Sequence, residues 1–209
     1  MTSTDSAPKT RRKRAAGEVS RARILNAARE IASERGYEGT SIAAVSAKCG
    51  LPASSIYWHF ADKDDLLAAV IESSFGAWLQ ALEFPATGSI EQRSIAVAVQ
   101  IAAGLMKSPD FIRLGLMLAL ERRPQEPRAR AMYLGVREQA CHALETGFGV
   151  MLPDLAPHQI RQLTTYALAG ADGLFIATEI SGDSLDLIEL FTLHARALVA
   201  TAAAMAGNA

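Results

Sequence analysis

The segment ASSIYWHF, residues 53–60, gathers hydroxyl, aromatic and imidazole side chains within two helical turns. A serine hydroxyl can donate and accept hydrogen bonds, and an imidazole can do either at its ring nitrogens. Small residues at the start of such a helix also let its backbone approach another surface closely. A helix that serves only a protein core rarely contains so many aromatic and polar groups together. The segment therefore indicates a helix that binds a polar partner.

The residues around this segment predict the elements that position it. Thr40 and Ser41 can cap the start of a preceding helix with their hydroxyl groups. Gly50 stands where that helix must end, because glycine adopts a positive φ without penalty. Pro52 favours the start of the next helix, where no backbone N–H is required. Residues 41–60 are therefore predicted to form a helix, a tight turn and a second helix.

This pattern resembles the DNA-binding module of the tetracycline-repressor (TetR) family of bacterial regulators. The matching positions run from a hydroxyl cap through an apolar–Tyr–x–x–Phe signature to a lysine, and are Thr40, Val45, Cys49, Gly50, Leu51, Ser54, Ser55, Ile56, Tyr57, Phe60 and Lys63. The resemblance implies an all-α protein with an N-terminal three-helix helix-turn-helix DNA-binding domain and a C-terminal helical domain for ligand binding and dimerisation. It also implies a repressor that binds a palindromic operator as a homodimer and is released by a small-molecule effector.

The second helix of a helix-turn-helix enters the major groove of double-stranded DNA, and its first turn faces the base edges. The methyl group of Ala53 could meet a thymine methyl, and the hydroxyls of Ser54 and Ser55 could pair with several bases. The resemblance implies phosphate contacts for Tyr57 and Lys63. The expected DNA contacts are Thr40, Ser41, Pro52, Ala53, Ser54, Ser55, Tyr57, Trp58, His59 and Lys63.

The apolar residues of the motif are expected in the core of the three-helix unit, and they are Ile42, Val45, Leu51, Ile56 and Phe60. Trp58 is expected to pack beside them and to reach a phosphate only through its indole N–H. Cys49 and Cys141 are interpreted as small buried residues, with a redox sensor as the alternative for each. Two cysteines indicate no disulfide framework.

Charge is distributed unevenly along the chain. Residues 1–63 contain 11 Lys and Arg against 6 Asp and Glu, a net charge of +5. Residues 64–209 contain 10 against 16, a net charge of −6. A basic end that coincides with the motif is the electrostatic pattern expected of a protein that meets phosphates at that end.

Helical periodicity recurs along the chain, and no segment shows the period-2 alternation of a strand for long. We expect a disordered basic tail at 1–17, a DNA-binding domain at 18–78 and a helical ligand-binding and dimerisation domain at 79–209. A helix is expected from Glu18 until Gly36 stops it. Helices after the motif are expected from Asp62 to Phe84 and near 89–106, 109–121, 126–151, 156–180 and 184–206, separated by Pro, Gly, Ser and Asp.

Composition and motifs exclude several classes of protein. We expect no membrane span, because no stretch has about 20 uninterrupted apolar residues, and no secretory signal. The four histidines lack a paired metal-ligand spacing, and no nucleophile elbow, phosphate loop or dinucleotide fingerprint is present. The sequence therefore predicts a cytoplasmic non-enzyme without metal or cofactor. An architectural DNA-binding protein that senses no ligand is the alternative.

The last two predicted helices are rich in Gly and Ala, which permits close approach of helices. This suits a four-helix dimer interface, and an intramolecular hairpin is the alternative. Large apolar or polar residues on apolar faces are the candidates for an effector pocket: Trp78, Met106, Phe111, Arg113, Met117, His142, Glu145, Tyr166, Asp172 and Phe175, with Phe84 and Phe148 in a wider set. Arg113 interrupts the apolar run FIRLGLMLAL and is expected either to bind an anionic ligand or to be paired within the fold.

The five basic residues between Lys9 and Arg14 generate a testable prediction. They could follow the minor groove as an arm, or they could have no role beyond general attraction to DNA. If they form an arm, deleting residues 1–14 reduces the slope of log affinity against log salt concentration by about 0.9 for each lost phosphate contact. DNA titrations at several salt concentrations measure the slope. An unchanged slope would show that these residues make no phosphate contacts as an arm.

Overall fold

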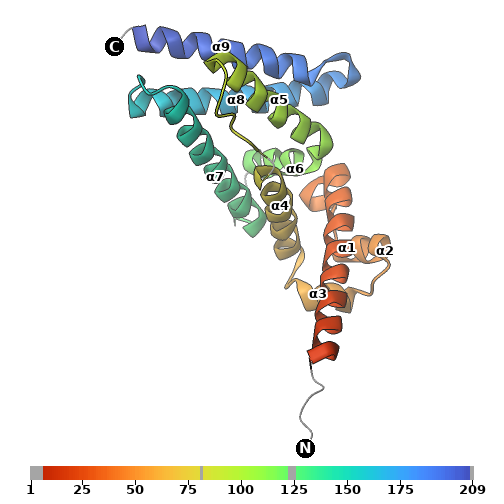
Figure 1. The fold of residues 1–209 in the computed structure, drawn as a ribbon. Coiled ribbons are helices and arrows are strands. Elements are labelled where there is room, and N and C mark those ends of the chain that lie inside the picture. The colour runs from red at the N-terminus through yellow and green to blue at the C-terminus, as the bar shows by residue number, and fades with distance from the viewer. Residues whose placement is uncertain (1–6, 81, 122–125, 208–209) are drawn as a thin grey trace, which may run out of the picture. The chain divides into compact units, whose positions relative to one another are not determined.

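The computed structural model describes residues 7–80, 82–121 and 126–207. Within these residues the regular elements are helices, which confirms the all-α prediction (Figure 1). They are α1 (Ala7–Gly39), α2 (Ile42–Cys49), α3 (Ala53–His59), α4 (Lys63–Gln80), α5 (Ile90–Lys107), α6 (Pro109–Leu120), α7 (Arg128–Met151), α8 (Pro157–Ser181), the short 3-10 helix η1 (Gly182–Ser184) and α9 (Leu187–Gly207).

Most helix boundaries follow the sequence signals, and the start of α1 does not. The sequence predicts a helix from Glu18, whereas α1 begins at Ala7. Residues 7–17 contain Ala, Lys and Arg, which favour helix without any apolar periodicity to reveal it. Residues 1–6, the rest of the predicted disordered tail, lie outside the described residues. Gly36 interrupts α1 with a φ of 66°, close to the predicted end.

The chain forms two compact units. Unit 1 consists of residues 1–75 and 110–134, and unit 2 consists of residues 76–109 and 135–209. The division of the chain into functional domains at residue 78 remains a prediction.

The core of unit 1 is built from apolar faces of α1 to α4. Its fully buried members include Ile24 and Ala28 of α1, Val45 of α2 and Ile56 of α3. Phe60 is also buried, and two further apolar residues of the motif, Ile42 and Leu51, pack against this cluster. The expected motif core is therefore confirmed.

Unit 2 contains α5, α8 and α9 side by side (Figure 1). His194 of α9 donates a hydrogen bond from Nε2 to the carbonyl of Ala167 on α8, at 3.0 Å. Its ring lies so close to Gly170 that a Cβ there would stand 2.2 Å from Cε1. The glycine therefore lets α8 and α9 approach each other within one chain.

A single carboxylate fastens three elements of unit 1. Asp64, in the first turn of α4, accepts hydrogen bonds from the backbone N–H groups of Arg128 at 2.6 Å and Ala129 at 3.1 Å. These are the first N–H groups of α7, which have no partner within the helix. The hydroxyl of Tyr37 on α1 donates to the same carboxylate at 3.2 Å. Asp64 therefore caps α7 and holds α1 beside α4.

Asp64→Ala should lower the free energy of unfolding by about 2 kcal/mol, because it removes a helix cap and a hydrogen bond to a charged group. Urea denaturation measures the change. Glu72→Ala, which alters an exposed carboxylate on the same helix, should change stability by less than about 0.5 kcal/mol. Equal effects of the two substitutions would contradict the structural role of Asp64.

Candidate nucleic-acid interface

Local hydrogen bonds fix the start and end of α2. Ser41 precedes α2 with an extended backbone, and its hydroxyl accepts from the N–H of Ala44 at 3.2 Å. Gly50 ends the helix with φ 66° and ψ 24°, and its N–H donates to the carbonyl of Ser46 at 3.0 Å. Only glycine adopts this left-handed conformation at no steric cost. The predicted cap and turn are therefore confirmed.

Two side chains hold the turn between α2 and α3. Ser46 Oγ donates to the carbonyl of Leu51 at 2.6 Å. Arg23, from α1, donates to the carbonyl of Cys49 at 2.7 Å. Pro52 then precedes α3 with φ −63°. These bonds satisfy backbone carbonyls at the end of α2 and so fix how α3 leaves the turn.

The two faces of α3 differ completely in exposure. Ile56 is 0% exposed and Phe60, which ends the helix, is 3% exposed. Tyr57 is 56% exposed and Trp58 is 75% exposed, and Ser54 is also exposed. The expectation that Trp58 packs into the core is wrong. One face of this short helix is anchored, and the other presents hydroxyl and aromatic groups to solvent.

Trp58 lies against residues of its own unit even though it is exposed. Its ring meets the ring of His59 edge to face, with centroids 4.6 Å apart. A Cβ at Gly17 would lie 3.7 Å from the same indole. The early turns of α1 therefore lie beside the exposed face of α3, a contact that helical periodicity alone does not predict.

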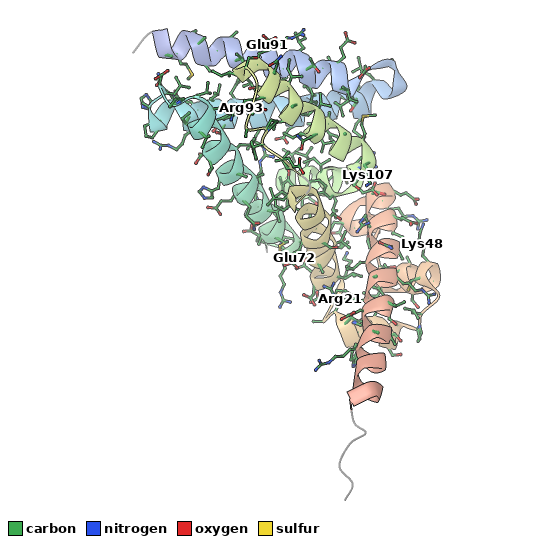
Figure 2. All side chains as sticks on the ribbon, in the orientation of Figure 1. Arg21, Lys48, Glu72, Glu91, Arg93 and Lys107 are labelled. Atoms are coloured by element: carbon green, nitrogen blue, oxygen red, sulfur yellow. The ribbon has the colours of Figure 1, made fainter. Side chains whose placement is uncertain are left out.

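Arg21 is a basic residue of this surface that the motif does not indicate. Its guanidinium lies over the ring of Phe60, 5.4 Å from the centroid. It is exposed on α1, as is Arg14 seven residues earlier (Figure 2 labels Arg21). Two residues seven apart share one helical face. That spacing is the signal in the sequence that could have identified them.

Burial lowers the pKa of His59, and the positive charge of Arg21 lowers it further. The imidazole is therefore neutral at pH 7, with one nitrogen able to donate and one able to accept a hydrogen bond. His59 is half-buried at the C-terminal end of α3, and Ala53 and Ser55 are half-buried near its start.

Three other expected DNA contacts lie around α3. Thr40 is 1% exposed, and its hydroxyl donates to the carbonyl of Gly36 at 2.8 Å. This hydroxyl holds the end of α1 and does not face solvent, whereas that of Ser41 is exposed. Lys63 Nζ donates to the backbone carbonyl of Tyr37 at 3.2 Å. The same nitrogen lies 4.3 Å from the centroid of the Tyr37 ring.

The residues expected in an effector pocket are divided between the two units. Phe111, Arg113 and Met117 belong to unit 1, where Arg113 pairs with Asp110 at 3.7 Å and donates to the carbonyl of Ser33 at 3.5 Å. In unit 2, exposed positions are occupied by Met106, His142 and Tyr166. Glu145 is half-buried and Phe175 is buried. Asp172 forms a bidentate ion pair with Arg137. The side chain of Trp78 is outside the described part of the structure.

Unit 2 instead encloses an apolar cavity of about 90 Å³ between α5, α7, α8 and α9. Phe84, Phe148 and Phe191 are among the residues that line it, and the first two belong to the wider set of candidates. Among the described residues that line it, the polar ones are Ser94 and His194. Convergence of four helices creates this site, so no local motif predicts it.

Cys49 is buried as expected, whereas Cys141 is only half-buried. Cys49 is 8% exposed, and its thiol donates to the carbonyl of Ser46 at 3.7 Å. Burial raises the pKa of the Cys141 thiol, which disfavours the reactive thiolate. Among the described residues, no group of three His, Cys, Asp or Glu side chains is placed to hold a metal ion.

One segment of the chain matches a known protein family. Residues 24–70 match the model of bacterial regulatory proteins, tetR family. Residues 24–70 are a TetR-family domain. This segment contains α2, α3 and most of the unit 1 core.

The curated relatives match over a segment of similar length. The transcriptional regulator UidR of Escherichia coli K12 is 45% identical over 51 residues, which cover 24% of this chain and 26% of UidR. AcrR of Shigella flexneri is 37% identical over 54 residues, which cover 26% of this chain and 25% of AcrR. The chain thus matches about a quarter of the length of each relative.

Solved structures match nearly the whole chain at low identity. A transcriptional regulator from Pseudomonas aeruginosa PAO1 is 16% identical with a TM-score of 0.74, over 90% of this chain and 92% of that one. FadR of Bacillus subtilis, solved with stearoyl-CoA, is 18% identical with a TM-score of 0.69, over 85% and 96%. At these identities the likeness shows the fold.

The lowered pKa of His59 predicts a pH-dependent stability. The unfolded chain takes up the proton first as pH falls, because its histidine has the ordinary pKa near 6.5. Wild-type protein should therefore lose stability relative to His59→Gln as pH falls through about 6.5, and the difference should level off below the folded pKa. Denaturation curves between pH 5 and 8 measure this. Arg21→Gln should reduce this loss of stability. If the free energy of unfolding varies with pH in the same way in wild type and His59→Gln, the prediction is refuted.

Proposed function

We propose that this protein is a ligand-responsive DNA-binding transcriptional regulator that acts as a repressor and binds a palindromic operator as a homodimer. The observation that carries the proposal is α3, which is anchored on one face and presents Tyr57, Trp58 and Ser54 on the other. A helix-turn-helix places this second helix in the major groove. The match of residues 24–70 to a family of bacterial regulatory proteins supports the same function.

The proposed contacts divide into two classes. Ala53, Ser54 and Ser55 at the start of α3 face base edges and supply specificity. The hydroxyls of Ser41 and Tyr57, with the indole N–H of Trp58, contact phosphates and fix position. The charges of Arg14, Arg21 and Lys63 add attraction that depends on salt concentration. Pro52 and His59 complete the proposed surface.

Exposed apolar residues on the last two helices support a dimer. Ile180 of α8 is 80% exposed and Leu193 of α9 is 63% exposed. A Cβ at Gly173 would meet nothing within 4 Å, which leaves room for a partner helix, whereas Gly170 already packs against His194. By length and composition α9 could also cross a membrane, with a mean hydropathy of 1.4 over a window that is 22% buried. We assign this exposed apolar face to a second copy in the cytoplasm, because a dimer presents two recognition helices to two half-sites.

The effector response is proposed to act through unit 2. A ligand need only prefer the DNA-incompetent state by a few kcal/mol to release the operator. FadR of Bacillus subtilis was solved with stearoyl-CoA, which supports a small-molecule site in this fold. The alternative, an architectural protein that senses nothing, predicts no ligand effect on DNA affinity.

Two substitutions test the proposed contacts on DNA selected by the wild-type protein from random duplexes. Tyr57→Phe should weaken binding roughly tenfold or more on every sequence, because a hydrogen bond to a charged phosphate is lost. Ser54→Ala should reduce the preference for one base pair and spare affinity for other duplexes. Fluorescence anisotropy measures both. Tyr166→Phe is a matched control, because Tyr166 on α8 is 54% exposed. Equal loss in Tyr57→Phe and Tyr166→Phe would contradict the interface.

A further inference from the structure

Two hollows of unit 2 share a wall. The apolar cavity and an open pocket on the surface are both lined by Phe84 and Met151. The open pocket is also lined by Pro85, Arg93 and His142, among other residues. Phe84 therefore stands where the interior cavity meets the open pocket.

Hydrogen bonds hold Phe84 at this boundary. Gln100 of α5 donates to the carbonyl of Glu83 at 2.9 Å and accepts from its N–H at 2.8 Å. Arg93 Nε donates to the carbonyl of Pro85 at 2.7 Å. The ring of Phe84 lies on α7, so close that a Cβ at Gly147 would stand 2.5 Å from it. The residues on both sides of Phe84 are thus hydrogen-bonded to α5, and its ring packs against Gly147.

The two hollows differ in polarity. Within the cavity the polar side chains are Ser94 and His194, and His194 already donates from Nε2 to the carbonyl of Ala167. A charged group buried there would have no ionic partner among the lining residues. The open pocket contains two basic side chains, Arg93 and His142 (Figure 2 labels Arg93).

Two carboxylates lie beside His142. Glu145 is 3.8 Å and Glu138 is 4.0 Å from its ring nitrogens. Arg93 is consequently the cation that a ligand in the open pocket would meet. The terminal N–H groups of an arginine match a carboxylate or phosphate in a bidentate arrangement.

We infer that the cavity and the open pocket form one continuous site for an anionic amphiphile. Its uncharged hydrocarbon chain passes Phe84 into the cavity, and its carboxylate or phosphate head stays in the open pocket beside Arg93. This assignment deepens the proposed effector response and rests on it for its regulatory meaning. Binding itself requires no DNA.

Isothermal titration calorimetry of the full chain without DNA tests the chain-binding half of the site. Affinity should rise about fourfold for each methylene from hexanoate to decanoate until the cavity is filled. Ala98→Leu, which fills part of the cavity, should weaken decanoate binding at least tenfold. Ala103→Leu, at an exposed position of the same helix, is the matched control and should bind like wild type. Equal decanoate affinity in the two variants would overturn the site.

The head group is tested with ligands of one chain length. Decanoate and decyl phosphate should each bind at least tenfold more tightly than decyltrimethylammonium, and their ratio shows which anionic head is preferred. Arg93→Gln should weaken decanoate binding tenfold and spare decanol, while Arg93→Lys should retain most of the affinity for decanoate. No discrimination between anionic and cationic heads would overturn the assignment.

The same ligands separate this inference from the proposed function. Decanoate that binds in the calorimeter but leaves affinity for selected DNA unchanged would refute the effector response and keep the site. If the protein binds selected DNA but none of these amphiphiles, the amphiphile site is refuted and the proposed DNA-binding function stands.

Discussion

The burial of one face of α3 is the constraint on which the rest of the helix-turn-helix in unit 1 depends. A helix of seven residues is not stable alone in water, because nucleation costs more than so few hydrogen bonds return. Ile56 and Phe60 supply the missing stabilisation by packing against the cluster formed with α1 and α2, at about 1.5–3 kcal/mol each. The same contact decides which side of α3 faces outward. One face of α3 therefore stabilises the helix, and the opposite face is the one proposed to contact DNA.

Polar groups convert this anchored helix into a defined surface. Arg23 and Ser46 satisfy carbonyls at the turn, and Gly50 supplies the left-handed residue that the turn requires. Asp64 ties the start of α7 to α4 and α1, so the surface is braced from a second direction. In unit 2 the balance is reversed, because apolar side chains surround a cavity and the charges lie outside it. Unit 1 thus exposes hydroxyl and aromatic side chains on α3, and unit 2 surrounds an apolar cavity.

The sequence predicted the motif because its signals are local. The caps at Ser41 and Gly50 and the apolar positions of α2 and α3 act within about twenty residues, so pattern and structure agree. Trp58 is exposed because it stands two residues from each of the buried Ile56 and Phe60, on the opposite face of α3. The approach of its ring to Gly17 of α1 has no local signal in the sequence. Thr40 is buried, and its hydroxyl donates to the carbonyl of Gly36, four residues earlier at the end of α1. The cavity needs the convergence of four helices, and of the candidates chosen from single helical faces Phe84 and Phe148 are among the residues that line it.

The central claim is that the exposed face of α3 binds DNA in two half-sites. A hydroxyl-radical footprint on a duplex selected by the wild-type protein tests it most directly, compared with a variant in which Ser54 and Tyr57 are both alanine. The account predicts two protected patches about 34–36 Å apart on one side of the duplex, lost in the folded variant. Protection that persists unchanged in the variant would show that another surface holds the DNA and would contradict the account.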